Sequence, residues 1–281
     1  MGWDIDFISE EDFRHHVANT VAQYGDLLLP YDVARFNKNT VDPIKMVFDK
    51  AIYGESWEGI ISSEIFRQRD KSGNNDIGFF HQYIFNYIDG CHAPKTGEEG
   101  GWDVIVDFPE GHLIEEADRV HKVYVEMKNK HNTMNSSSSQ KTYMKMQNAL
   151  LRDDDAACFL VEAIAKQSQN VIWRTTLDGN KVSHKRIRRV SIDKFYEIVT
   201  GQHDAFLQIC FALPEVVNDV LKGTESVSMP QDTVYEELLE RAKKFMNVDS
   251  DMDIAMMLSM YMLGFSTYNG FEERFGFALN S

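Results

Sequence analysis

The chain has 281 residues, enough to bury a large core, and its 43% hydrophobic content is ordinary for a globular protein. No run approaches the roughly 18 apolar residues of a membrane span, and the acidic start lacks the pattern of a signal peptide. A net charge of -15 argues at first against a nucleic-acid partner, and three scattered cysteines exclude a disulfide framework and are expected to be free thiols in a reducing cytosol.

The first 90 residues are expected to be helical. Apolar residues at helical spacing, several of them after a polar cap, predict helices over residues 9–25, 43–54, 60–69 and 77–88. The polar run DKSGNN, residues 70–75, is expected to be a loop between the last two helices.

A strand-rich block follows the loop at residues 92–101. Alternating or continuously apolar runs predict strands over residues 102–108, 120–128, 157–164, 170–177 and 181–192. Helices are expected over residues 139–152 and 193–200, and again from Pro214 onward, including 232–246.

This order of elements predicts an α/β fold. A central mixed β-sheet would be flanked by helices, with helical additions at both ends of the chain. We expect one domain of 281 residues with a helical part at 1–90, an α/β core at 91–200 and a helical part at 201–281.

The net charge hides an asymmetry along the chain. Residues 119–194 hold 15 Lys and Arg against 7 Asp and Glu, a net charge of +8 within an acidic protein. A basic middle of this kind suits a groove for a polyanion. The alternative, favoured slightly by charge alone, is a solvated pattern without a partner.

Glu126 and Lys128 form the only acid-x-Lys pattern in the chain. They share one face of their strand because side chains alternate with a period of two. An antiparallel hairpin turning near residues 114 and 115 would place Asp103 opposite Glu126, and Asp107 opposite Lys122. Without that pairing, an exposed strand face without function is the simpler interpretation.

Two opposed carboxylates repel each other unless a cation lies between them. Oxygen ligands favour a hard cation such as Mg²⁺, which binds through one or two carboxylates and keeps several waters. Asp103 and Glu126 are therefore candidate metal ligands beside the Lys128 amine. A metal with a neighbouring lysine can activate water and stabilise a phosphoryl transition state.

A tract rich in hydrogen-bond donors follows Lys128 directly. Such side chains suit phosphate oxygens and base edges. The candidate DNA contacts are Lys130, His131, Asn132, Asn135, Ser136, Ser137, Gln140 and Lys141, with a second group at Lys185, Arg186 and Arg188. The alternatives are that the Ser and Asn residues are turn formers and helix caps, and that some of the basic residues simply face water.

Asp103 at a strand start, followed by Glu126-x-Lys128 on the next strand, resembles the PD-(D/E)XK nuclease core, with Trp102 where the pattern has Pro. The stretches GWDVIVDF, EMKNKHNTMNSSSSQKTYMKMQ and RIRRVSIDKFYEIVTG resemble one family of type II restriction endonucleases, which cuts GGNCC.

The resemblance implies a Mg²⁺-dependent cut of double-stranded DNA at a short palindromic site, leaving 5'-phosphates, by a bacterial cytoplasmic homodimer. It implies that Asp103 and Glu126 hold the metal and that Lys128 orients or deprotonates the attacking water. It also implies a further acid from an upstream helix, for which Glu64 is the candidate, although a solvated helix residue is the simpler interpretation. The terminal helices are candidates for dimerisation.

Two other functions fit the same residues. The first is another nuclease of this core, such as a junction resolvase or a repair nuclease, with the same chemistry on a different substrate. The second is a DNA-binding protein with a decayed site, against which the intact Asp103, Glu126 and Lys128 argue.

Overall fold

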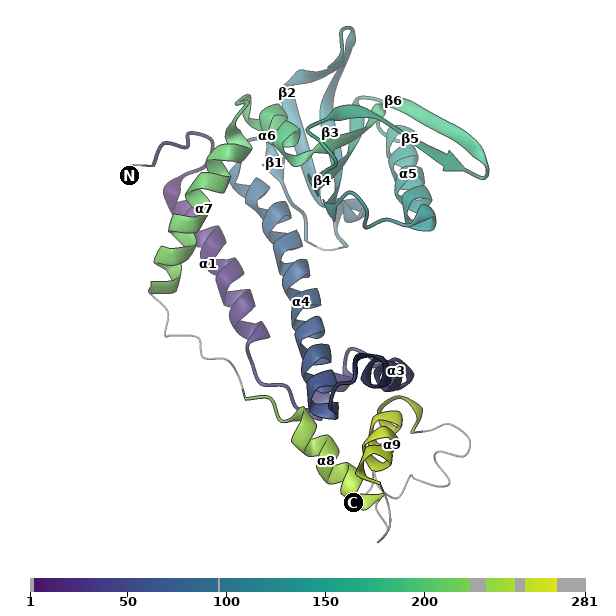
Figure 1. The fold of residues 1–281 in the computed structure, drawn as a ribbon. Coiled ribbons are helices and arrows are strands. Elements are labelled where there is room, and N and C mark those ends of the chain that lie inside the picture. Colours follow the sequence, from purple (N-terminus) through teal and green to yellow (C-terminus); the bar gives the residue numbers. More distant parts are fainter. Residues whose placement is uncertain (1–2, 96, 223–230, 246–250, 267–281) are drawn as a thin grey trace. The chain divides into compact units, whose positions relative to one another are not determined.

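A computed structural model describes residues 3–95, 97–222, 231–245 and 251–266. The chain forms two compact units (Figure 1). The first unit contains residues 1–23 and 75–226, and the second contains residues 24–74 and 227–281. The division passes through two helices, α1 (Glu10–Leu27) and α4 (Trp57–Tyr83), so the units cut across the consecutive parts expected from the sequence.

The first unit is built on a six-stranded mixed sheet with the order β1-β2-β3-β4-β6-β5. β3 is parallel to β4 and β4 to β6, whereas β1–β2, β2–β3 and β5–β6 are antiparallel pairs. The strands are β1 (Cys91–His92), β2 (Val104–Glu115), β3 (Asp118–Lys130), β4 (Ala156–Ile164), β5 (Asn170–Leu177) and β6 (Asn180–Ser191). The predicted α/β fold with a central mixed sheet is confirmed.

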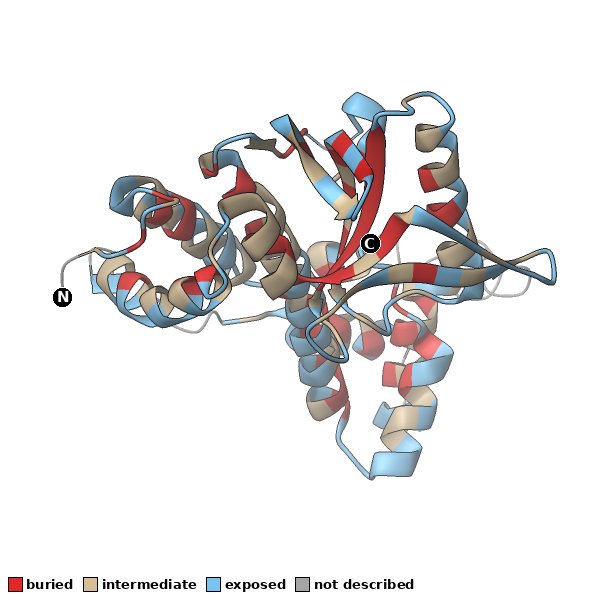
Figure 2. Ribbon diagram, turned by 90° about the horizontal axis from the view of Figure 1, so that it is seen from above, coloured by how far each residue is buried: buried red, intermediate tan, exposed pale blue. Residues whose placement is uncertain are grey.

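Helices pack against both faces of this sheet (Figure 1). One face packs on α5 (Ser136–Leu150) through Ile105 and Leu160. The other face, carrying Val104 and Val125, packs on α6 (Ile192–Thr200), α7 (Ala205–Lys222), η1 (Ile84–Tyr87) and the parts of α1 and α4 in this unit. β4, in the interior of the sheet, is therefore buried along most of its length, and buried strands lie in the middle of the sheet in Figure 2.

The second unit is helical. It contains α2 (Val33–Asn37), α3 (Pro43–Tyr53), α8 (Val234–Lys244), α9 (Met252–Phe265) and the first part of α4. Phe36, Ile61, Leu238 and Met260 are buried in its core. The helix predicted over residues 232–246 corresponds to α8, and Met246 lies outside the described residues. Of the helices that the structure describes, none is long and apolar enough to cross a membrane.

The loop predicted over residues 70–75 is wrong, because α4 continues through this segment. Asp70 and Asn74 are exposed on the outer side of the helix, where the Asn74 Nδ2 donates to the Asp70 carbonyl oxygen over 2.8 Å. Gly73 is buried beside Tyr24 of α1, and a Cβ there would lie 3.4 Å from the Tyr24 hydroxyl. The polarity of the run therefore reflects an exposed helix face, and its glycine permits a close helix contact.

The segment between the strands predicted over residues 102–108 and 120–128 is mostly strand. β2 continues to Glu115 and β3 begins at Asp118, with irregular pairing between Asp107 and His112 and again near the tip. The hairpin that carries the acid-x-Lys pattern is thus longer than predicted, and its tip is irregular while its base is regular.

Candidate active site

The base of the β2–β3 hairpin brings Asp103 next to the acid-x-Lys pattern. Val104 pairs with Val125 and Asp107 with Lys122, so the predicted pairing at the base is confirmed, although the turn lies two residues later than predicted. Asp107 forms an ion pair with Lys122 at 3.2 Å. Asp103 lies just outside the strand, where its backbone N–H donates to the Val125 oxygen over 2.9 Å.

The Asp103 carboxylate is held against the backbone of β3. Its Oδ2 accepts a hydrogen bond of 2.6 Å from the Met127 N–H, the residue between Glu126 and Lys128. Beyond the last regular backbone pair, Val104 and Val125, this side-chain hydrogen bond thus holds the segment before β2 against β3. A side chain that is fixed in this way is positioned before any ligand binds.

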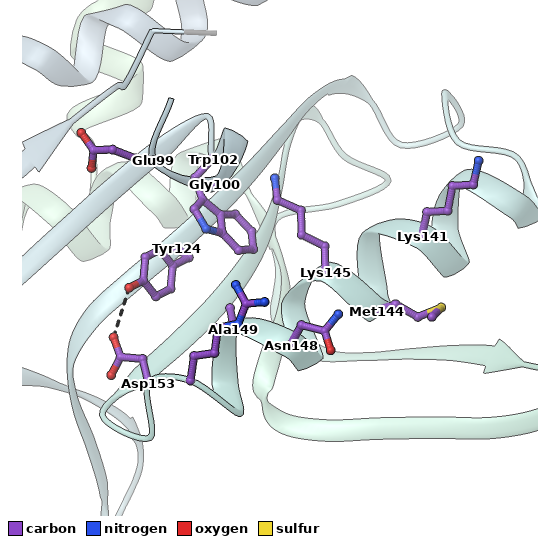
Figure 3. A pocket seen from close by; sticks show the side chains of 11 residues that line it. Glu99, Gly100, Trp102, Tyr124, Lys141, Met144, Lys145, Asn148, Ala149 and Asp153 are labelled. Carbon is purple, nitrogen blue, oxygen red and sulfur yellow. Dashed lines mark hydrogen bonds between the residues drawn. The ribbon is translucent and has the colours of Figure 1, made fainter. Parts of the chain in front are cut away.

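Glu126 lies between two lysines. One carboxylate oxygen accepts from the Lys128 Nζ at 2.8 Å, and the other accepts from the Lys145 Nζ at 2.9 Å. Lys145 comes from the middle of α5, and its Nζ also donates to the Gly101 carbonyl oxygen at 2.6 Å. It lies 4.0 Å above the Trp102 ring, a cation–π contact that fixes the ammonium (Figure 3).

Burial, followed by the negative charge of Glu126, raises the pKa of Asp103. Burial also disfavours the charged form of Glu126, but Lys128 and Lys145 outweigh it and lower the pKa of this carboxyl. Glu126 is therefore stabilised as an anion, whereas the negative charge on Asp103 is only partly compensated.

A third acid, Glu162 of β4, lies near this site. Glu162 is in register with Lys128 of β3, so the two side chains project from the same face of the sheet. Its side chain is buried, and Arg189 of β6 donates to one carboxylate oxygen over 2.9 Å. The other oxygen has no hydrogen-bond partner among the described residues. Arg189 also donates to the carbonyl oxygen of His131.

A cavity of about 720 Å³ opens beside Lys145 (Figure 3). Trp102 and Tyr124 form one wall, with ring centroids 5.3 Å apart, and the Tyr124 hydroxyl donates to Asp153 over 3.1 Å. Lys141 and Lys145 come from successive turns of α5 and line the opposite wall. Lys145, which binds Glu126, thus also lines this cavity together with Lys141.

The candidate DNA contacts after Lys128 fall into two groups. Within the described part of the chain, side chains that are exposed and form no ion pair occur at Lys130, Asn132, Ser136, Ser137 and Lys141. The other candidates have contacts within the protein. Asn135 caps α5, because its side chain accepts a hydrogen bond from the Ser138 N–H, and the Gln140 side chain donates to the Thr176 carbonyl oxygen. His131 is half-buried, and its backbone N–H donates to the Ile164 carbonyl oxygen. Capping, which the sequence left open as an alternative, is thus observed for Asn135.

The candidate contacts on β6 are engaged within the protein. Lys185 and Arg186 both form ion pairs with Asp118, and the buried Arg188 donates to Asn170 and lies near Glu115. Hydrogen bonding from Arg186, followed by that from Lys185, lowers the pKa of Asp118 to about 2. The charges of both cations are therefore partly neutralised before any DNA binds.

Glu64, the expected further acid, belongs to the second unit. Its carboxylate accepts from Arg67 and Gln68 within that unit. Across the described ranges, no group of three or more His, Cys, Asp or Glu side chains is placed to hold a metal ion.

The chain matches a known protein family over most of its length. The model of the Eco47II restriction endonuclease family matches residues 5–222, which include the whole candidate site. The chain belongs to the Eco47II restriction endonuclease family. The predicted enzyme class, a type II restriction endonuclease, is thereby confirmed.

Two type II restriction enzymes are similar to this chain over nearly their whole length. The type II restriction enzyme Sau96I of Staphylococcus aureus is 28% identical over 247 residues, covering 85% of this chain and 89% of the relative. The type II restriction enzyme Eco47II of Escherichia coli is 24% identical over 242 residues, covering 80% and 93%.

Proposed function

We propose that the chain is a Mg²⁺-dependent restriction endonuclease of the PD-(D/E)XK type. It would cut double-stranded DNA at a short palindromic site, GGNCC, and leave 5'-phosphates. Asp103, Glu126 and Lys128 would form the catalytic site. The observation that carries this proposal is the arrangement of Asp103 and Glu126 at the base of one hairpin, with two lysine amines on Glu126.

The donor set fits a hard divalent cation. Asp103 and Glu126 supply carboxylate oxygens, and burial followed by the charge of Glu126 raises the pKa of Asp103. A cation between the two carboxylates would relieve their repulsion. One or two carboxylates with several waters are a common set for Mg²⁺. Both oxygens of Glu126 are bound to lysines, so a cation would replace one of these ammonium contacts.

When bound, Mg²⁺ supplies positive charge at the phosphate and lowers the pKa of a bound water. Lys128 would orient the attacking water or donate to the phosphate oxygens as their negative charge grows. Lys145 acts as a positioning residue, because it ties Glu126 of β3 to the Gly101 carbonyl next to Asp103. The Met127 N–H keeps Asp103 directed at the same place.

A two-fold symmetric site requires two copies of this half-site, so we propose that the enzyme acts as a homodimer on duplex DNA in the bacterial cytoplasm. The donor-rich segment after Lys128 would then lie near the DNA. Its exposed members, Lys130, Asn132, Ser136, Ser137 and Lys141, are the DNA contacts that we retain from this segment.

A digest of plasmid DNA of known sequence tests this function. With Mg²⁺, the protein should produce discrete fragments whose ends map to GGNCC, and the isosteric Glu126→Gln variant should produce none. Fragments whose ends map to another palindrome would support the proposed enzyme class but contradict GGNCC as the recognition site. A smear of products would favour a repair nuclease, and cleavage restricted to branched DNA would favour a resolvase.

A further inference from the structure

The hairpin of β5 and β6 leaves the sheet as a two-stranded ribbon, defined here as residues 174–183. β4 pairs with β6 only from Ile187 to Ser191, so the ribbon has no third strand beside it among the described residues. A register irregularity between Ile172 and Arg174 separates it from the rest of the hairpin. Its free end is drawn beyond the sheet in Figure 1, and its tip is exposed in Figure 2.

The ribbon has two different faces. The inner face packs on α5: Leu177 and Val182 contact the core cluster beneath α5, and the ring of the preceding Trp173 lies 5.3 Å from that of Tyr143. The hydroxyls of Ser139 and Thr175 are 3.3 Å apart, next to the hydrogen bond from Gln140 to the Thr176 oxygen. The ribbon is therefore fixed to the first turns of α5, which follow the segment after Lys128.

The outer face is polar and basic. Arg174 lies opposite Ser183 and Thr176 lies opposite Lys181, and all four side chains are exposed. None of the four is a carboxylate. Over the described ranges, neither Arg174 nor Lys181 has an ion pair or a side-chain hydrogen bond, in contrast to Lys185 and Arg186, which pair with Asp118. Both cations of this face therefore keep their charge free for a polyanion.

From this face we infer that the ribbon binds a groove of duplex DNA, with Arg174, Thr176, Lys181 and Ser183 toward the nucleic acid. The inference rests on the proposed function. A major groove about 12 Å wide admits a two-stranded ribbon, and the charge of the outer face is complementary to the phosphates that border the groove. Arginine pairs with guanine through two hydrogen bonds in this groove, and each strand of GGNCC carries two guanines. Arg174 is therefore the base-reading side chain, and Lys181 is the phosphate contact.

The test compares double variants of the whole protein. Arg174→Ala with Lys181→Ala removes both charges of the outer face. The control, Lys194→Ala with Lys222→Ala, removes two charges from α6 and α7, which pack on the opposite face of the sheet. Affinity is measured with Ca²⁺ on a duplex carrying the site mapped in the digest, at several salt concentrations. Thermal unfolding confirms that each variant is folded.

We expect the ribbon variant to weaken binding at least about tenfold and to reduce the slope of log K against log salt by about 1 for each phosphate that the variant no longer binds. The control should stay within about twofold of the original protein. Equal affinities for the ribbon variant and the original protein would overturn the inference. A protein that neither binds nor cleaves duplex DNA would overturn the proposed function itself, which is a different result.

A second variant tests base reading separately from charge. Arg174→Lys keeps the charge but loses the two-pronged guanidinium, so we expect the preference for the mapped site over a duplex with its guanines replaced to fall about fivefold or more. The salt dependence should stay the same. An unchanged preference would overturn base reading by Arg174.

Discussion

Replacing Lys128 with alanine should lower the rate of DNA cleavage by about 10² to 10³, the effect found when one donor to a developing oxyanion is removed. The Lys128 Nζ lies 2.8 Å from Glu126 and is partly exposed at the site. Glu126 keeps its contact with Lys145 in this variant, so no buried carboxylate is left unpaired. DNA affinity measured with Ca²⁺ should therefore remain close to that of the original protein.

Lys130→Ala is the matched control for this experiment. Lys130 is two residues further along β3, is exposed, and has no ion pair within the described part of the chain. Its removal is expected to weaken DNA binding modestly and to leave the single-turnover rate at saturating enzyme within about tenfold. If Lys128→Ala cleaved as fast as the original protein, the catalytic assignment of this lysine would be wrong.

The second large effect concerns the two carboxylates. Asp103→Asn and Glu126→Gln each preserve the shape of the side chain but remove one negative charge from the proposed metal site. We expect each to weaken binding of Mn²⁺ on the order of tenfold or more, and to abolish measurable cleavage. Calorimetric titration with Mn²⁺ measures the loss without depending on activity.

Asp107→Asn is the control for this pair. Asp107 belongs to β2, which Asp103 directly precedes, and by alternation it lies on the same face as Asp103, but it pairs with Lys122. Its substitution should leave both Mn²⁺ affinity and cleavage nearly unchanged. Weaker binding in Asp107→Asn, with normal binding in Asp103→Asn, would move the metal site to the other end of the hairpin.

The sequence predicts the pairing at the base of the β2–β3 hairpin correctly but misplaces its turn, which lies at residues 116 and 117 instead of 114 and 115. Strand alternation places Glu126 and Lys128 on one face, and the position of the turn sets which residues oppose each other. Val104 pairs with Val125 as expected, even though the hairpin tip is irregular and longer than predicted. The irregular pairing between Asp107 and Glu115 shifts the register back by the same amount that the later turn moves it, so the two departures offset each other at the base.

Contacts between segments distant in sequence could not be predicted in the same way. Lys145 reaches Glu126 only because α5 crosses the face of the sheet, and Glu162 lies beside Lys128 only because β3 and β4 are parallel neighbours. A signal for Glu162 was available, since it is an acid inside an otherwise apolar strand. Such a residue in a buried strand requires a partner, here Arg189.

For residues 70–75 the sequence predicts a loop, but the structure has a helix there, α4. The composition of this segment is typical of a loop, and Gly73 strengthened that interpretation. Tertiary packing outweighs these preferences, because the segment continues a long helix whose glycine lies against Tyr24. The two different faces of the β5–β6 ribbon could not be predicted either. Basic residues alternate along both the ribbon and the part of the hairpin within the sheet, so the sequence does not distinguish the two parts.

The most direct test of the central claim is a crystal structure of the protein grown with Mn²⁺ and duplex DNA, with anomalous scattering used to locate the metal. We predict a peak about 2.1 Å from carboxylate oxygens of both Asp103 and Glu126, with the Lys128 amine beside it. A peak bound to other residues, or none near this pair at saturating Mn²⁺, would contradict the proposed site.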